Sequence, residues 1–416
     1  MRSLLANRIQ SGSDRASFDK SCKGNSLTEP NDGRLNVSDV ATRYFPKDKA
    51  DQFQLKQGDL LVERSGGGPE QPVGRVGFID NDMPGATVSN FVQVLRPDAK
   101  KVEAAYLGWV LFELQRTGII ERVQQQSTQM RNLNWRDYQR LLLPWPDLPE
   151  QRGIAAALKL ADDAINKVRA ELESTRMLRR AAASEFLEKG LPFWHSAFTP
   201  TKYWTLPIAW EPVCVKHLLS YMDAGSSPMC ESDPARPGQW GVLKVSAVSW
   251  DRFEELENKA LPATIEPELA AEVKVGDIIV SRANTTELCG AVQRVQSLYT
   301  RLLLCDKTWR LHPKEDVNPD WLVAVLKHPL ARKQIEANAT GTSDSMKNIA
   351  KRDFRNVIVP RPPKVEQDEI ARVLNGIDVQ IEATEAKAKA LLEVKCSLLQ
   401  NLLTGRFRLS QGVTHA

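Results

Sequence analysis

Two long stretches of the chain carry apolar residues at alternating steps of four and three. The first runs through Ile154, Leu158, Ala161, Ile165, Val168 and Leu172. The second runs through Ile370, Leu374, Ile377, Ile381, Thr384 and Ala388, and continues through Leu391, Lys395, Leu398 and Leu402 with Lys395 as the main exception. This spacing is typical of a coiled-coil seam. A lone amphipathic helix would pack on its own domain, whereas two equivalent helices are expected to pair with each other.

The segments outside these helices show a different pattern. Short β-rich runs lie at 60–62, 76–79 and 278–280, and helical stretches lie around 106–113 and 321–327. Glycine and proline punctuate all of them, which favours an α+β fold for each globular part.

Comparison of the chain with itself reveals a tandem repeat. Residues 56–64 return as 274–282 at an offset of 218 (282 − 64), and residues 130–138 return as 346–354 at 216 (354 − 138). Residues 35–40 return as 243–248 at 208 (248 − 40). Collinear matches of this kind predict a duplicated architecture. We therefore expect globular domains at 1–145 and 199–360, helices at 146–198 and 361–410, and a tail at 411–416.

Composition narrows the class of protein. The 416 residues are 42% hydrophobic and 26% charged, which is ordinary for globular protein and long enough for two or three folding units. The start of the chain has no secretion signal, and no stretch is apolar enough for a membrane helix, so we expect a soluble, cytoplasmic protein. The net charge of +4 does not identify a polyanion partner by itself.

The residue types that commonly bind metals or perform catalysis do not form recognisable motifs in this chain. The six cysteines and five histidines are scattered, so we expect reduced, mostly buried thiols and no metal site. There is no phosphate-binding loop, and the glycine run 65–68 is expected to be a flexible loop. Asn318-Pro-Asp-Trp321 is expected to start a helix, with Asn318 or Asp320 near its cap. We predict no catalytic residues.

Polar, basic runs precede both helices. The first spans residues 122–140 and the second spans 341–355. Cations bind phosphates and amides read base edges, so these runs suit a nucleic-acid surface, although each alone also fits a solvated loop and helix end. Arg64 and Arg282 follow β-rich runs and fit either DNA contact or a structural ion pair. The DNA-binding candidates are Arg64, Ser65, Thr128, Gln129, Arg131, Arg136, Arg282, Asn284, Ser345, Lys347, Asn348 and Lys351.

These repeated motifs resemble the specificity subunits of Type I restriction-modification enzymes over nearly the whole chain. The resemblance rests on the Lys-x-Gly-Asp elements at 56–62 and 274–280 and on the polar runs into Met-(Arg/Lys)-Asn-(Leu/Ile). It also rests on the Pro-rich Glu-Gln-x-x-Ile-Ala junctions at 143–155 and 359–371 and on the closing run 399–408. The duplicated junction is the most specific of these signals.

The resemblance implies two target-recognition domains that read a bipartite site on double-stranded DNA, joined by two antiparallel spacer helices. It implies that the helical regions dock methyltransferase subunits, two in number, with restriction subunits joining the complex. S-adenosylmethionine, ATP and Mg²⁺ would then belong to the partners, with no cofactor in this chain. The spacer and docking candidates are Glu150, Gln151, Ile154, Leu158, Ile165, Leu172, Glu366, Gln367, Ile370, Leu374, Ile381 and Leu398.

One departure from exact duplication leaves alternatives open. The second copy has an opening segment at 203–216 that the first copy lacks. Either the start is truncated, or the C-terminal residues 406–409 return to the first domain and fill the gap. The leading hypothesis for function is a DNA-recognition subunit. The alternatives are a fragment of a fused restriction-methyltransferase and a dimerising protein scaffold.

Overall fold

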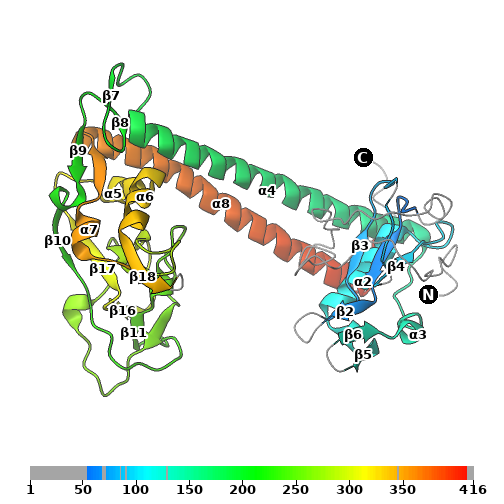
Figure 1. Cartoon of the computed structure of the whole chain (residues 1–416). Coiled ribbons are helices and arrows are strands. Elements are labelled where there is room, and N and C mark those ends of the chain that lie inside the picture. Colours follow the sequence, from blue (N-terminus) through cyan, green and yellow to red (C-terminus); the bar gives the residue numbers. More distant parts are fainter. Residues whose placement is uncertain are drawn as a thin grey trace. The chain divides into compact units, whose positions relative to one another are not determined.

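The computed structural model describes residues 54–67, 72–84, 86–89, 91–127, 130–343 and 346–409, without the side chains of 126, 127, 130, 342 and 343. Contacts divide the chain into two compact units (Figure 1). The described parts of unit 1 are residues 54–170 and 385–409, and unit 2 is residues 171–384. Each unit therefore contains the start of one long helix and the end of the other.

Unit 1 is built on a small antiparallel sheet of order β3-β1-β4. Its strands are β1 (Leu60–Glu63), β3 (Val76–Phe78) and β4 (Val92–Leu95), and helix α2 (Ala104–Arg116) packs against it. A second sheet of order β2-β6-β5 follows, formed by β2 (Ser65–Gly67), β5 (Gln124–Ser127) and β6 (Met130–Leu133). The short helices η2 (Ile119–Val123) and α3 (Trp135–Tyr138) flank this second sheet in the chain.

Unit 2 repeats the plan that the structure describes in unit 1. Its main sheet has the order β10-β17-β13-β15, from β10 (Leu219–Asp223), β13 (Ile278–Ser281), β15 (Val292–Arg294) and β17 (Thr308–Pro313). The helices are α5 (Pro319–Lys327), α6 (Pro329–Asn338) and α7 (Lys351–Arg355). The second sheet, of order β14-β19-β18, consists of β14 (Ala283–Asn284), β18 (Ala339–Ser343) and β19 (Met346–Ile349).

Unit 2 also contains one further sheet, two strand pairs and three short 3-10 helices. The sheet has the order β12-β11-β16, from β11 (Trp240–Leu243), β12 (Asn258–Ala260) and β16 (Arg301–Leu303). The pairs are β7 (Phe198–Pro200) with β8 (Thr205–Pro207), and β9 (Glu211–Cys214) with β20 (Ile358–Arg361). The 3-10 helices are η3 (Val215–His217), η4 (Val245–Ala247) and η5 (Leu269–Ala271).

The tandem repeat predicted from the sequence is confirmed strand by strand. Strand β1 pairs with β3 and β4 as β13 pairs with β15 and β17, and the registers match: Leu61 lies opposite Gly77, and Ile279 lies opposite Gln293. The helix predicted to start at the Asn-Pro-Asp-Trp motif is also confirmed. Asn318 caps α5 by accepting hydrogen bonds from the backbone N–H groups of Asp320 and Trp321.

Two expectations need correction. Residues 65–67 were expected in a flexible loop, but they form strand β2, because their backbone pairs with β6. The thiols were expected to be mostly buried. Of the five described cysteines, all free, Cys289 and Cys305 are buried, whereas Cys214, Cys230 and Cys396 are only partly covered; Cys22 lies outside the described residues.

The two long helices begin where the sequence predicts. Helix α4 spans Leu148–Lys189 and α8 spans Lys364–Leu403, and they lie side by side (Figure 1). An ion pair joins Asp162 to Lys395 in unit 1 and another joins Arg179 to Asp378 in unit 2. Both pairs have the same sum of residue numbers, 557 (162 + 395 and 179 + 378), as antiparallel helices require. The predicted antiparallel pairing is confirmed.

Each unit completes its core with the end of the helix that starts in the other unit. In unit 1, Leu399 and Leu402 of α8 are buried with Ile154 and Leu158 of α4 and with Trp109 of α2. In unit 2, Ala182 and Leu187 of α4 are buried with Ile370 and Leu374 of α8. The apolar seam is therefore part of both cores.

A buried glutamine fixes the start of each long helix to the domain before it. In unit 1, the side chain of Gln151 accepts a hydrogen bond from the Glu103 N–H, just before α2, and donates one to the Pro146 carbonyl. Gln367 does the same in unit 2, accepting from the Asn318 N–H and donating to the Pro362 carbonyl. Both glutamines are 1% exposed, so water does not replace these bonds.

Gln151→Leu and Gln367→Leu are each expected to lower the free energy of unfolding by about 1–3 kcal/mol. Leucine fills a similar volume but leaves a buried N–H and a buried carbonyl without partners. Denaturant unfolding followed by circular dichroism measures the loss. Gln380→Leu, at an exposed position of α8, is the control and is expected to change stability little. Equal stability of the wild type and both core variants would contradict this role.

Candidate nucleic-acid interface

The described residues of the polar run at 122–140 include strands β5 and β6 of the second sheet of unit 1 and the short helix α3. Strand β6 is central, between β2 and the edge strand β5. Asn132 lies opposite Ser65 on one side and Gln125 on the other, and Arg131 is its neighbour on β6. Successive side chains of a strand point to opposite faces of a sheet, so Arg131 and Asn132 lie on opposite faces of this one. The structure thus gathers Ser65 and Arg131, which are far apart in the sequence.

The run at 341–355 supplies strand β19 and most of β18 to the equivalent sheet in unit 2. Strand β19 is central, with Asn348 opposite Ala283 of β14 and Thr340 of β18, and Lys347 opposite Asn284. Lys347 and Asn348 thus repeat the positions of Arg131 and Asn132 at the offset of 216.

Arg64 and Arg282 occupy the same place in the two units. The Arg64 carbonyl accepts a hydrogen bond from Leu133 N–H, and the Arg282 carbonyl accepts one from Ile349 N–H. Each guanidinium also lies over a tryptophan ring. The distance from the guanidinium carbon Cζ to the ring centre is 5.8 Å for Arg64 over Trp135 and 5.7 Å for Arg282 over Trp309. Both guanidinium groups therefore make a cation–π contact within their own unit.

The other sequence candidates differ in their surroundings. Arg136 is exposed on α3. Asn284 is buried, and its amide nitrogen lies within hydrogen-bond distance of the Val245 carbonyl and the Ser281 hydroxyl. The Lys351 ammonium donates to the Met222 carbonyl at 2.7 Å. Thr128, Gln129 and Ser345 lie outside the described residues.

Sequence reasoning missed the residues that flank the central strands. Gln125 and Thr340 belong to the edge strands β5 and β18, and Asn132, the counterpart of Asn348 in the Met-(Arg/Lys)-Asn-(Leu/Ile) motif, was not among the DNA-binding candidates. The offset of 216 would have identified Asn132. The edge positions depend on strand register, which the polar runs do not reveal.

Comparisons with known proteins agree with this architecture. Residues 24–174 match the family described as "Type I restriction modification DNA specificity domain". The Type I restriction enzyme EcoEI specificity subunit of Escherichia coli is 33% identical over 169 residues, which are 40% of this chain and 28% of that protein. The putative Type I restriction enzyme MjaX specificity subunit of Methanocaldococcus jannaschii is 24% identical over 86% of this chain and 80% of its own length.

This chain is similar to Type I restriction-modification specificity subunits, and its residues 24–174 match their DNA specificity domain. A crystal structure of the S subunit of a Type I restriction-modification system from M. genitalium shares the fold. Its TM-score is 0.54 at 14% identity, over 85% of this chain and 84% of that one.

The Lys-x-Gly-Asp motif of this chain has a structural role in both units. In unit 1, the Asp59 carboxylate accepts a hydrogen bond from the Lys56 N–H and binds the Arg96 guanidinium through both oxygens. Gly58 has φ 85°, a left-handed conformation that favours glycine. These bonds hold the turn that leads into β1 beside the end of β4.

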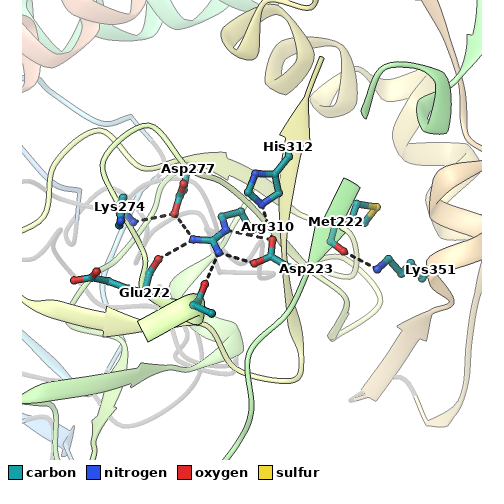
Figure 2. A network of polar contacts seen from close by, with 9 residues as sticks. Met222, Asp223, Glu272, Lys274, Asp277, Arg310, His312 and Lys351 are labelled. Atoms are coloured by element: carbon teal, nitrogen blue, oxygen red, sulfur yellow. Dashed lines mark hydrogen bonds and ion pairs between the residues drawn. The ribbon is translucent and has the colours of Figure 1, made fainter. Parts of the chain in front are cut away.

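The same motif in unit 2 carries a larger network (Figure 2). Arg310 of β17 binds Asp277 and Asp223 on two sides and donates to the Glu272 carbonyl. His312 also contacts Asp223, at 2.6 Å. Burial raises the pKa of Asp223, but hydrogen bonds from Arg310 and His312 outweigh burial and bring that pKa below its ordinary value.

The docking candidates on the helices include several buried side chains. Glu366 accepts hydrogen bonds from the Trp210 indole at 2.8 Å and from the Leu191 N–H, and lies 2.8 Å from His195. In unit 1, Arg408 binds Glu150 through both carboxylate oxygens. Residues 406–409 thus return to the start of α4, as one of the alternatives above supposed, but form no strand as far as Leu409.

The remaining seam candidates are placed within the two cores or along the helix pair. Ile154, Leu158, Ile165, Ile370 and Leu374 are buried, and Leu172, Ile381 and Leu398 are partly covered. Within the described ranges, no group of three His, Cys, Asp or Glu side chains is arranged to hold a metal ion. No helix in the same ranges has a stretch apolar enough to cross a bilayer.

The pH dependence of stability tests the network in Figure 2. Because the pKa of Asp223 is lower in the folded chain, its stabilising effect is fully present above the unfolded-state pKa of about 3.9 and is lost as pH falls through the folded value. We expect Asp223→Asn to be less stable than the wild type near pH 7 and to converge with it in acid. Thermal unfolding across this range measures the difference, and a constant difference at all pH values would contradict this expectation.

Proposed function

We propose that this chain is the DNA-recognition subunit of a Type I restriction-modification complex. The observation that carries the proposal is the pair of equivalent sheets, each with a cation and an asparagine at the same register of its central strand. A cation binds phosphate oxygens, and an asparagine amide can form two hydrogen bonds with adenine in the major groove. That groove is wide enough for a two-stranded β-ribbon.

Each sheet is proposed to read one half of a bipartite site on double-stranded DNA. Since the two sheets share one plan but differ in side chains, Arg131 and Gln125 in one and Lys347 and Thr340 in the other, the two half-sites are expected to differ in sequence. The antiparallel helices α4 and α8 are proposed to act as the spacer that sets the gap between the half-sites.

Catalysis is assigned to partner subunits. The proposed partners are two methyltransferase subunits, docked on the helical regions, and restriction subunits in the larger cytoplasmic complex. This chain is proposed to be non-catalytic and to bind no cofactor, with S-adenosylmethionine, ATP and Mg²⁺ held by the partners. Because Glu150, Gln151, Glu366 and Gln367 are buried, docking is proposed to use exposed faces of the helices, and these four residues to support them.

Removing the cation of each central strand tests the proposal. Arg131→Ala and Lys347→Ala are each expected to weaken DNA binding by about 1–3 kcal/mol if the side chain contacts bases, or to flatten the salt dependence by about one unit if it contacts phosphate. Fluorescence anisotropy with duplexes that carry the selected site, at several salt concentrations, distinguishes the two cases.

Lys167→Ala and Lys387→Ala are the matched controls, because they remove the same charge from exposed positions of α4 and α8. They are expected to leave affinity and salt dependence close to those of the wild type. Unchanged affinity and salt dependence in both Arg131→Ala and Lys347→Ala would remove the two sheets from the interface.

A further inference from the structure

The apolar seam of the paired helices contains one buried cation. Lys395 is 1% exposed, and its ammonium lies 2.7 Å from the Asp162 carboxylate and 4.3 Å from the centre of the Trp109 ring. A lysine at a seam position is costly unless it is paired, since burial removes its hydration. The seam has an apolar or small residue at most other positions, so this cation is a specific feature of the helix pair.

The same ion pair recurs in the other unit. Adding the repeat offset to Asp162 gives Asp378 (162 + 216), and subtracting it from Lys395 gives residue 179 (395 − 216), which is an arginine. Arg179 binds Asp378 through two hydrogen bonds of 2.9 and 3.0 Å. Each unit therefore has one aspartate from a helix start joined to one cation from a helix end.

The sequence around Lys395 would allow a second register of the helix pair, shifted by one heptad, if the Asp162–Lys395 pair were absent. Leu398, Leu399, Leu402 and Leu403 complete the core of unit 1, and seven residues earlier stand Leu391, Leu392, Lys395 and Cys396. Sliding α8 by one heptad would keep apolar residues on the seam at most positions. In one of the two directions, the slide would also move the Lys395 ammonium to the buried position of Leu402, away from Asp162.

In antiparallel helices, residues that face each other have a constant sum of residue numbers, which is 557 in this structure. A slide of one heptad in either direction changes this sum by seven. At a sum of 550 (557 − 7), Lys395 faces Ala155 and Arg179 faces Ala371, so both cations lose their partners. At a sum of 564 (557 + 7), Lys395 faces Arg169, a like charge, while Arg179 gains an opposite charge in Glu385 and Asp378 is left facing Phe186. Both pairs are therefore satisfied together only in the observed register, and polar pairs of this kind are a known means of fixing the register of helix pairs.

We propose that Asp162–Lys395 and Arg179–Asp378 are register locks that determine which gap between half-sites the protein accepts. This inference rests on the proposed function, because it assumes that the helices set the gap. A slide of one heptad moves one helix along the other by about 10 Å at 1.5 Å per residue. That distance corresponds to roughly three base pairs at about 3.4 Å per pair.

The test neutralises both locks while keeping side-chain volume: Lys395→Met with Asp162→Asn, together with Arg179→Met and Asp378→Asn. The matched control replaces Lys395 by arginine and Arg179 by lysine, which keeps both charges. Bound duplexes are selected from a library in which the gap between half-sites varies. The wild type and the control are expected to select one gap, and the neutral variant to select in addition gaps about three base pairs longer or shorter.

Cysteine cross-linking reports the register without DNA. Residue 161 lies opposite Cys396 at the sum of 557, whereas residues 154 and 168 do so at 550 and 564. We expect Ala161→Cys to form a disulfide with Cys396 in the wild-type background. Ile154→Cys and Val168→Cys are expected to do so in the neutral background only, or several-fold more than in the wild-type background.

The outcomes separate the two levels of the proposal. If the wild type selects no duplex, the proposed function fails, while the cross-links still test the register. If the folded neutral variant selects the same single gap and forms the same single cross-link as the wild type, the register locks are refuted. A broadened gap distribution with slid cross-links in the neutral variant, and not in the charge-keeping control, supports them.

Discussion

The structure depends on the exchange of helix ends between the two repeats. Each unit has a core cluster that is completed by the end of the other unit's helix: leucines from the end of α8 in unit 1, and Ala182 and Leu187 from the end of α4 in unit 2. Burial of these apolar side chains is the main stabilising contribution, and each fully buried leucine is worth about 1.5–3 kcal/mol. The antiparallel direction of the helices follows, because each helix has to start in one unit and end in the other.

The most specific sequence motif of the chain is explained by this exchange. In the Glu-Gln pair at each helix start, the glutamine bonds the preceding domain and the glutamate bonds the segment that follows the end of the other helix. The partners of the glutamate differ, Trp210 and His195 in unit 2 and Arg408 in unit 1, although the buried carboxylate is the same. The motif is thus a junction of three segments, and its buried side chains support the surfaces around it.

Periodicity and self-comparison predicted the helices, the repeat and the α+β class. The apolar seam is a local pattern along each helix, and the repeat shows as matching segments in the same order at a nearly constant offset. They did not predict that Ser65 pairs with Asn132, or that residues 65–67 form a strand. Those features arise from pairing between segments more than sixty residues apart, which the glycine run itself does not encode. Asn284 shows the same limit, since its polar side chain suggested DNA contact and the fold gives it internal partners.

The central claim is that two equivalent sheets, each in its own unit, read separate halves of one DNA site. Exchange of residues 1–145 for the equivalent segment of a related specificity subunit tests it most directly, with selection of bound duplexes from a random library before and after. The account predicts that one half-site changes while the other half-site and the gap remain. A change in both half-sites together, in a folded chimera, would contradict it.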